Sequence, residues 1–201
     1  MIALIDYGMG NLGSVEKALQ AAGCAVSITA DPRVLEAADG LVLPGVGAFD
    51  DCMAGLTEHG LVEPLRELIA ADKPFLGICL GLQMLFERSE EGSRPGLGVF
   101  AGRVERFRHE LKIPQIGWNQ IQVRQAAPQL EGVPEGSWFY FVHSYYVVPQ
   151  DEGLICTTTE YGYEFCSAIR RGNLFACQYH PEKSQDVGLQ VLANFRRLTE
   201  M

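Results

Sequence analysis

The sequence predicts an α/β protein with a mostly parallel central sheet flanked by helices and additional antiparallel strands in its C-terminal half. Two observations lead to this fold class. In the first half of the chain, apolar runs alternate with amphipathic stretches, which is the rhythm of β-α-β units. After residue 102, strand-like segments follow one another directly. The length of 201 residues suffices to bury a full core, so a single domain over residues 1–201 is expected.

The first half supplies the alternating elements. Its expected strands are short apolar runs that suit a sheet covered on both faces, and they lie at residues 2–5, 25–29, 41–43 and 73–78. Its expected helices lie at residues 11–22, 61–71 and 80–87. Glycine and charge are concentrated in residues 90–102, which predicts a loop there.

The second half is expected to form mainly strands. They lie at residues 103–107, 120–123, 138–142, 154–158, 168–170 and 174–178. An amphipathic pattern then predicts a closing helix over residues 185–199. No internal repeat, low-complexity tract or linker divides the sequence.

Composition excludes several classes of function. The net charge of −9 argues against a nucleic-acid partner, which requires a basic face. The N-terminus lacks the pattern of a signal peptide, and no run approaches the roughly 18 apolar residues of a membrane span, so a cytoplasmic protein without membrane contact is expected. The cysteines form no C-x-x-C pair, and neither disulfides nor a metal or other cofactor are expected.

The isolated cysteines and histidines carry weak signals. Three cysteines lie in apolar runs and are expected to be small buried hydrophobes: Cys24, Cys156 and Cys177. Cys52 and Cys166 show no usable pattern. His59 and His109 are expected at the surface, and spacing alone leaves His143 undecided.

Cys79 has surroundings typical of a catalytic nucleophile. It stands in G-I-C-L-G at residues 77–81, between an expected strand and an expected helix. A sharp turn of this kind is a nucleophile elbow, here with sulfur in place of the serine oxygen. The glycines permit the tight bend, and the helix N-terminus favours the thiolate over the thiol.

The tripeptide His180-Pro181-Glu182 supplies candidate partners for that nucleophile. It follows the expected strand at 174–178, and Pro181 keeps the chain extended, so that His180 and Glu182 can project to the same side. His180 would act as the base and Glu182 would orient its ring. A lone histidine is more often structural, but the combination with the Cys79 elbow favours a catalytic triad.

Two glycine-rich turns leave alternatives open. G-M-G-N-L-G at residues 8–13 matches the dinucleotide-binding pattern G-x-G-x-x-G. The alternative, which carries more weight, is a tight turn in which Asn11 or Ser14 caps the helix. L-P-G-V-G at residues 43–47 is either a simple turn or a source of backbone N–H groups for a developing oxyanion. In a parallel sheet this second turn and the Cys79 elbow emerge at the same edge, where ligands of such folds bind.

Several motifs together resemble a known family over essentially the whole chain, the class I glutamine amidotransferases. The elbow is shared by this whole class. D-Y-G-M-G-N at 6–11 and H-P-E-K-S at 180–184 are more specific. Together with G-W-N at 117–119 they narrow the resemblance to the glutaminase subunits of imidazole glycerol phosphate synthases. The resemblance implies the fold of that class and glutamine hydrolysis by a triad of Cys79, His180 and Glu182. It also implies that the G-x-G-x-x-G pattern is not a nucleotide site.

The resemblance assigns roles to further residues. It places the oxyanion hole at Gly45, Val46, Gly47 and Leu80. It places the substrate glutamine against Gln83, His143, Ser144 and Tyr145. It implies a heterodimer with a (β/α)8 barrel cyclase, which uses the ammonia in a lyase reaction that forms imidazole glycerol phosphate and aminoimidazole carboxamide ribotide in histidine biosynthesis. The residues facing the barrel would be Asn11, Trp118, Tyr140 and Lys183.

Two departures and two competing functions remain. Gly13 stands where the family commonly has arginine and Gln115 where histidine is common, which leaves the detail of the partner contact open. The nearest competitor is the glutaminase subunit of anthranilate or aminodeoxychorismate synthase, which usually carries H-Q where Leu82 and Gln83 stand here. The other is a nucleotide-binding regulatory protein in which Cys79 is merely buried, and rapid alkylation of Cys79 would argue against it.

Overall fold

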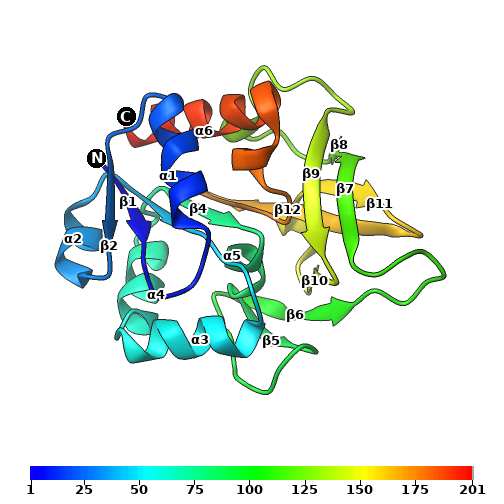
Figure 1. Ribbon diagram of the computed structural model, residues 1–201, viewed down its shortest axis with the longest axis horizontal. Helices are drawn as coiled ribbons and strands as arrows, with labels where there is room; N and C mark the ends of the chain where they lie inside the picture. Colours follow the sequence, from blue (N-terminus) through cyan, green and yellow to red (C-terminus); the bar gives the residue numbers. More distant parts are fainter. Residues whose placement is uncertain (201) are drawn as a thin grey trace.

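The computed structural model describes residues 1–200, which build two sheets flanked by helices (Figure 1). The larger sheet has the strand order β2-β1-β3-β4-β13-β12-β10-β6-β5, with β11 paired to β12 and β8 paired to β11. The smaller sheet is a ribbon of β7 and β9. The predicted α/β architecture, a parallel sheet extended by antiparallel strands, is confirmed.

One half of the large sheet consists of strands that all pair in parallel. They are β1 (Ile2–Ile5), β2 (Val26–Thr29), β3 (Gly40–Leu43), β4 (Phe75–Ile78) and β13 (Leu174–Cys177). All except the edge strand β2 are completely buried, as expected for apolar runs covered by helices on both faces. Because β4 and β13 are parallel neighbours, the segments that follow them leave the sheet at the same edge.

The remaining strands are antiparallel to their neighbours, except that β5 pairs with β6 in parallel. They are β5 (Phe86–Ser89), β6 (Phe100–Arg106), β7 (Gln115–Gln120), β8 (Gln122–Val123), β9 (Trp138–His143), β10 (Tyr145–Pro149), β11 (Ile155–Glu160) and β12 (Glu164–Arg171). The ribbon of β7 and β9 stands at the side of the molecule opposite β2 (Figure 1).

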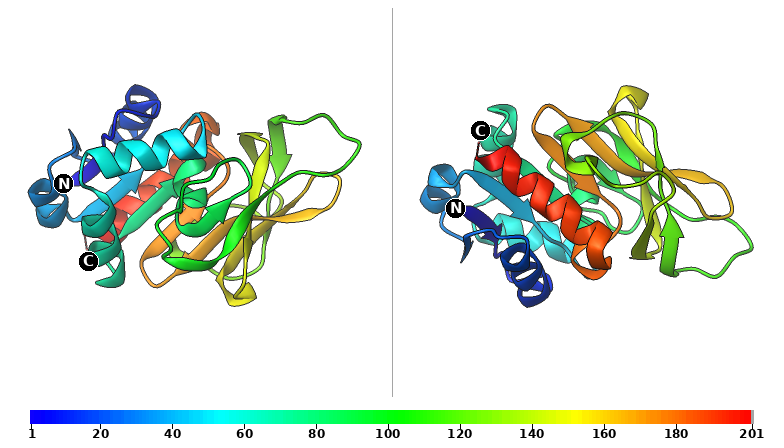
Figure 2. Two further views of the ribbon diagram at one scale, coloured as in Figure 1. Left: turned by 90° about the horizontal axis from the view of Figure 1, so that it is seen from below. Right: turned by 90° about the horizontal axis from the view of Figure 1, so that it is seen from above.

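Helices cover both faces of the parallel half. They are α1 (Leu12–Ala21), α2 (Pro32–Ala37), α3 (Phe49–Glu58), α4 (Val62–Ala70), α5 (Leu80–Gln83) and α6 (Gln185–Thr199), with short turns η1 (Pro128–Leu130), η2 (Glu152–Leu154) and η3 (Pro181–Lys183). Alternate strand residues face opposite cores: Leu41 and Leu43 pack with α3 and α4, whereas Val42 packs with α1 and α6. Figure 2 shows α6 lying across one face and α3 across the other. Within residues 1–200, no helix has the length and apolar character needed to cross a membrane.

Several predicted elements are wrong in part. The helix expected at 80–87 ends at Gln83, and Phe86 begins strand β5 instead, because an apolar run that is buried on all sides has no period that separates helix from strand. The loop expected at 90–102 ends earlier, since Phe100 already pairs with β5. The strand expected at 120–123 coincides with β8, and it touches β7 only at Gln120. Helices α2 and α3, strand β10 and residues 115–119 of β7 were not predicted.

Candidate active site

The predicted elbow places Cys79 between β4 and α5. Its backbone has φ +54° and ψ −107°, a conformation that non-glycine residues rarely adopt and that is typical of strained nucleophile turns. The turn is held by the N–H of Cys79, which donates to the carbonyl of Cys177 at 2.8 Å. Gly81 permits close packing behind it, because a Cβ there would lie 2.0 Å from the carbonyl oxygen of Leu43. The neighbouring backbone thus holds Cys79 in its strained conformation. A larger residue in place of Gly81 would displace that backbone.

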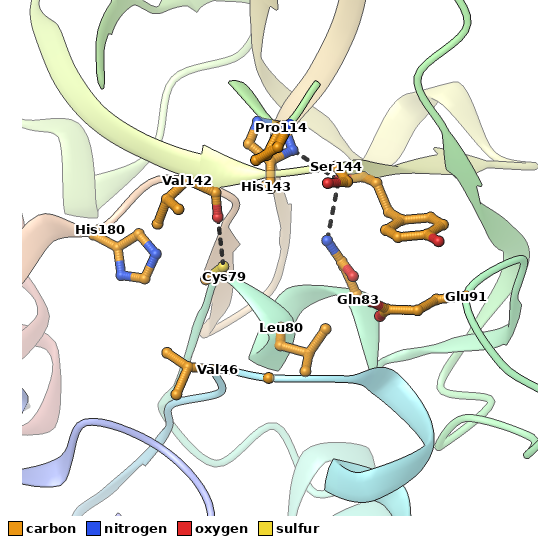
Figure 3. A pocket seen from close by; sticks show the side chains of 12 residues that line it. Val46, Cys79, Leu80, Gln83, Glu91, Pro114, Val142, His143, Ser144 and His180 are labelled. Atoms are coloured by element: carbon orange, nitrogen blue, oxygen red, sulfur yellow. Dashed lines mark hydrogen bonds between the residues drawn. The ribbon is translucent and has the colours of Figure 1, made fainter. Parts of the chain in front are cut away.

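His180 and Glu182 follow β13 and reach the same sheet edge as Cys79. His180 Nδ1 donates to Glu182 Oε1 at 2.7 Å, and each side chain is only 2% exposed. The backbone of His180 is fixed on both sides, by the carbonyl of Tyr140 and by the hydroxyl of Ser184. The ring lies beside Cys79 (Figure 3), and among residues 1–200 its Nε2 has no hydrogen-bond partner. The three residues therefore have the arrangement of nucleophile, base and orienting carboxylate.

The charge of His180 is set by its two neighbours. Burial alone lowers the pKa of His180, but the negative charges that Cys79 and Glu182 can carry raise that pKa to about 10. The raised pKa makes His180 a stronger base than a free imidazole. The ring can take up the Cys79 proton, which activates the nucleophile, and can then give that proton to the leaving group.

A pocket of about 260 Å³ opens over the Cys79 sulfur (Figure 3). Its size suits a small metabolite. Its walls are formed by Val46, Gly47, Cys79, Leu80, Gln83, Glu91, Pro114, Val142, His143, Ser144, Tyr145 and His180. The structure thus brings together the predicted triad nucleophile and base, three of the four predicted oxyanion residues and all four predicted substrate residues.

Gly45 lies behind the pocket wall and lets two loops meet. A Cβ at this position would be 2.7 Å from Leu80 Cβ and 3.0 Å from the N of Gly81. The glycine therefore allows the turn after β3 to pack directly against the elbow. This contact brings the backbone of Val46 and Gly47 next to the nucleophile, as the oxyanion interpretation requires.

His143 is buried, and both of its ring nitrogens have hydrogen-bond partners. Burial lowers the pKa of His143 to about 4, so the ring is neutral at pH 7. Its Nδ1 faces the carbonyl oxygen of Tyr145 at 2.7 Å, which can only accept, so Nδ1 carries the proton. The atom 2.9 Å from Nε2 is placed as Gln115 Oε1, so a neutral His143 ring requires the Gln115 amide to be turned over, with its NH₂ group donating to Nε2. The departure at Gln115 therefore preserves a partner for His143.

Two residues of the site were not predicted from the sequence. Glu91 lines the pocket, and its Oε2 accepts the N–H of Phe49 at 3.0 Å. Burial raises the pKa of the Glu91 carboxyl group. Gln178 is completely buried beside the Cys79 sulfur. Glu91 lies in a charged loop and Gln178 at a strand end, and neither carries a local pattern that could have identified it.

Three of the four predicted partner-facing residues form a chain of contacts that ends at His180. The structure does not test their role. The Tyr140 ring packs edge-on to Trp118 at 6.2 Å and lies 6.5 Å from the His180 ring. Lys183 Nζ sits 5.7 Å from the Tyr140 ring centre. Asn11 is exposed, and its side chain accepts the N–H of Ser14 to cap α1.

The structure confirms most of the predictions made for the isolated cysteines and histidines. The predicted buried cysteines Cys24, Cys156 and Cys177 are buried, and so are Cys52 and Cys166. His59 is exposed as predicted. The surface placement of His109 is wrong in part: the ring packs between Phe107 and Tyr161, and both ring nitrogens are covered. The cause is a cluster of aromatic side chains from separate strands, which no local pattern reveals.

Comparison with known proteins places the chain in the class that this site defines. The family model for glutamine amidotransferase class-I matches residues 3–198, so the chain belongs to the class I glutamine amidotransferase family. Within that class it is similar to the protein named imidazole glycerol phosphate synthase subunit HisH. The relative from Syntrophotalea carbinolica is 52% identical, over 97% of this chain and 98% of that protein. The relative from Thermosynechococcus vestitus is 54% identical, over 99% of this chain and 97% of that protein.

Solved structures support the fold. A crystal structure of a glutamine amidotransferase superposes with a TM-score of 0.78 at 20% identity, covering 100% of both chains. A glutamine amidotransferase from Thermotoga maritima gives 0.74 at 17% identity, over 100% of this chain and 98% of that chain. At such identities the likeness establishes the shared architecture alone.

Proposed function

We propose that this chain is the glutaminase subunit of imidazole glycerol phosphate synthase, which hydrolyses glutamine and passes the ammonia to a cyclase subunit in histidine biosynthesis. The observation that carries the proposal is the triad in its pocket, in a chain 52–54% identical over nearly its whole length to subunits of that synthase. The partner is a (β/α)8 barrel that forms a heterodimer with this chain and performs the lyase reaction. The complex works in the cytoplasm.

The first half of the reaction forms a thioester. The Cys79 proton passes to His180 Nε2, and the thiolate attacks the carbonyl carbon of the glutamine side-chain amide. The carbonyl oxygen becomes an oxyanion, which accepts hydrogen bonds from the N–H of Leu80 and from an N–H of segment 45–47. The His180 imidazolium then protonates the amide nitrogen. The C–N bond breaks, ammonia leaves, and a γ-glutamyl thioester remains on Cys79.

The second half restores the enzyme. Water gives a proton to His180 as its oxygen attacks the thioester carbon. The C–S bond then breaks to release glutamate, and the His180 imidazolium returns the proton to the Cys79 sulfur. Glu182 accepts the hydrogen bond from Nδ1–H at 2.7 Å. This bond holds the ring with Nε2 toward Cys79 and stabilises the imidazolium.

Glu91 is suited to select the amino-acid end of glutamine. Its carboxylate lines the pocket that contains Cys79, and burial together with the negative charges of Asp50 and Asp51 raises its pKa, so the carboxylate would be stabilised by a cation. An α-ammonium group at this place would supply that cation. The pocket therefore has a thiol for the side-chain amide and a carboxylate for the amino group.

Glu91→Gln is expected to raise KM for glutamine about tenfold or more while changing kcat little, because a charged hydrogen bond contributes on the order of 1.5–3 kcal/mol. The amide oxygen can still accept the N–H of Phe49, so the loop is kept. The measurement is steady-state glutamate release with glutamine and with 4-carbamoylbutanoate, which lacks the α-amino group. Glu91→Gln should lose the preference for glutamine, and the neighbouring surface variant Glu90→Gln should keep it. An unchanged preference in Glu91→Gln contradicts the assignment.

An exposed apolar face beside the triad is suited to the cyclase. Directly opposed residues of β7 and β9 share a face of the ribbon, and three large hydrophobic side chains on it are 43–58% exposed: Ile116, Trp118 and Trp138. Tyr140 links this face to His180. Exposed aromatic residues around a covered catalytic histidine are typical of an interface core. Ammonia released at His180 would emerge under this face.

Trp118→Ala is expected to weaken cyclase binding by at least about tenfold, since a central interface tryptophan often contributes about 2 kcal/mol or more. The 43% exposed ring packs mainly on Tyr140, so the fold should survive. Titration calorimetry with the purified cyclase measures the affinity. Ile28→Ala is the control, because that residue is 39% exposed on the edge strand β2. Equal affinity for both variants and the wild type would place the cyclase elsewhere.

The function itself is tested by glutamate release with and without the cyclase and its ribonucleotide substrate. The proposal predicts release that the cyclase strongly stimulates. A rate of glutamate release that is the same with and without the cyclase would assign the chain to another amidotransferase pathway, such as that of anthranilate synthase. No hydrolysis under any condition would refute the glutaminase.

A further inference from the structure

A buried glutamine at the catalytic centre has no role in the mechanism above. Gln178 comes directly after β13 and two residues before His180, and its side chain is fully shielded from solvent. A buried amide requires hydrogen-bond partners to offset the loss of water. The partners of Gln178 are the nucleophile and a residue of the substrate pocket.

Three hydrogen bonds connect the pocket to the nucleophile. Gln83 Nε2 donates to the carbonyl oxygen of Tyr145 at 3.1 Å and to Gln178 Oε1 at 2.9 Å. Gln178 Nε2 in turn donates to Cys79 Sγ at 3.5 Å. Gln83 and Tyr145 both line the pocket. Figure 3 shows the Gln83 amide directed toward the segment that carries Ser144.

The direction of this chain follows from its first acceptor. A peptide carbonyl can only accept, so Gln83 must present its NH₂ group to Tyr145. The second hydrogen of that NH₂ group then requires an acceptor, so Gln178 must turn Oε1 toward Gln83. The NH₂ group of Gln178 is thereby directed at the sulfur. No other assignment of the two amides satisfies all three contacts.

We propose that Gln178 is a catalytic residue that stabilises the Cys79 thiolate through its Nε2–H. An N–H donor favours a thiolate, which accepts strongly, over a thiol, which accepts weakly. The donor also fixes the sulfur on the side of the pocket, where the substrate carbonyl binds. The inference rests on the proposed glutaminase function and adds to it a second donor for the sulfur besides His180.

Gln83 gives this donor its rigidity. Without the contact at Oε1, the Gln178 amide could rotate and turn its oxygen toward the sulfur, which would repel a thiolate. The Oε1 of Gln83 is itself buried and, among residues 1–200, has no partner. A substrate that donates to this oxygen would hold Gln83, and through it Gln178, in the productive orientation.

The test compares Gln178→Met with the wild type. Methionine has a similar length and no N–H donor. The rate of iodoacetamide alkylation of Cys79 is measured against pH, and the midpoint is expected to move upward by about one pH unit on loss of a charged hydrogen bond. With the cyclase present, kcat for glutamine is expected to fall about tenfold, with little change in KM.

A matched control removes the general effect of the substitution. Gln129→Met also replaces a fully buried glutamine, but one that lies away from the pocket. The backbone carbonyl of Gln129 accepts a hydrogen bond from the Asn194 side chain of α6. Its alkylation profile should match that of the wild type. Thermal unfolding of each variant verifies the fold.

A folded Gln178→Met chain with an unchanged alkylation midpoint overturns the proposal, even if its kcat falls. Should this variant not fold, the side-chain amide protons of Gln178 in the wild type give the same answer by NMR. The chemical shifts of these protons are expected to change with pH, with the same midpoint as the alkylation of Cys79. Chemical shifts that do not depend on pH would refute the contact with the thiolate. Alkylation requires no glutamine turnover, so a failure of the glutaminase function would be recognised separately, in the wild-type assay.

Discussion

Cys79→Ala abolishes glutamine hydrolysis, with an expected loss of at least about 10⁴-fold in kcat, because no other group can form the acyl intermediate. Cys79 is the cysteine whose sulfur faces the pocket beside His180. The substitution removes one sulfur from a site 7% exposed, so the fold and the affinity for the cyclase should be kept. Glutamate release and calorimetric binding of the cyclase measure the two properties separately.

Cys156→Ala is the matched control for that result. Cys156 is also buried, and its sulfur contacts only the carbonyl of Gln125 among the hydrogen-bond partners in residues 1–200. This variant should lose some stability through the small cavity but retain full activity. If Cys79→Ala still hydrolyses glutamine at a comparable rate, the covalent mechanism is wrong.

Glu182→Gln is expected to lower kcat by about 10²- to 10⁴-fold with little change in KM. The carboxylate accepts a hydrogen bond from Nδ1–H of His180. The side chains of His180 and Glu182 are each only 2% exposed, so the negative charge is not screened by water. An amide there offers no negative charge. Its NH₂ group can also favour the ring tautomer with the proton on Nε2, and that nitrogen then has no lone pair to accept the proton of Cys79.

The consequence for His180 can be read independently of turnover. Glu182 is one of the groups that raise the pKa of His180 to about 10, so Glu182→Gln should lower the pKa of that imidazole. NMR titration of the ring in the variant and in the surface control Glu131→Gln measures it. The ring should lose its proton at lower pH in Glu182→Gln only. An unchanged kcat in this variant would show that the carboxylate does not orient the base.

The parallel half of the fold was predictable because its elements are marked locally. The helix at 185–199 agrees with α6, since its apolar residues repeat at helical spacing. Helix α3 also carried such a signal: Phe49, Met53 and Leu56 share one buried face, and acidic residues occupy its first turn. That helix could have been predicted. The strand β5 could not, because its pairing with Phe100 is decided by the sheet and not by its own pattern.

The candidate site divides in the same way. Cys79 and His180 stand in short motifs whose geometry follows from a strand end and a turn, so local sequence predicted them. Glu91 and Gln178 act through contacts between distant segments. Gln178 meets Gln83 across 95 positions of the sequence, and no local pattern records such a contact.

The most direct test of the central claim, covalent hydrolysis of glutamine at Cys79, is mass spectrometry of the chain quenched in acid during turnover with the cyclase. The mechanism predicts a γ-glutamyl group on the peptide that contains Cys79, and none in Cys79→Ala. Glutamate production with no acyl group on Cys79, or with the acyl group on another residue, would contradict it.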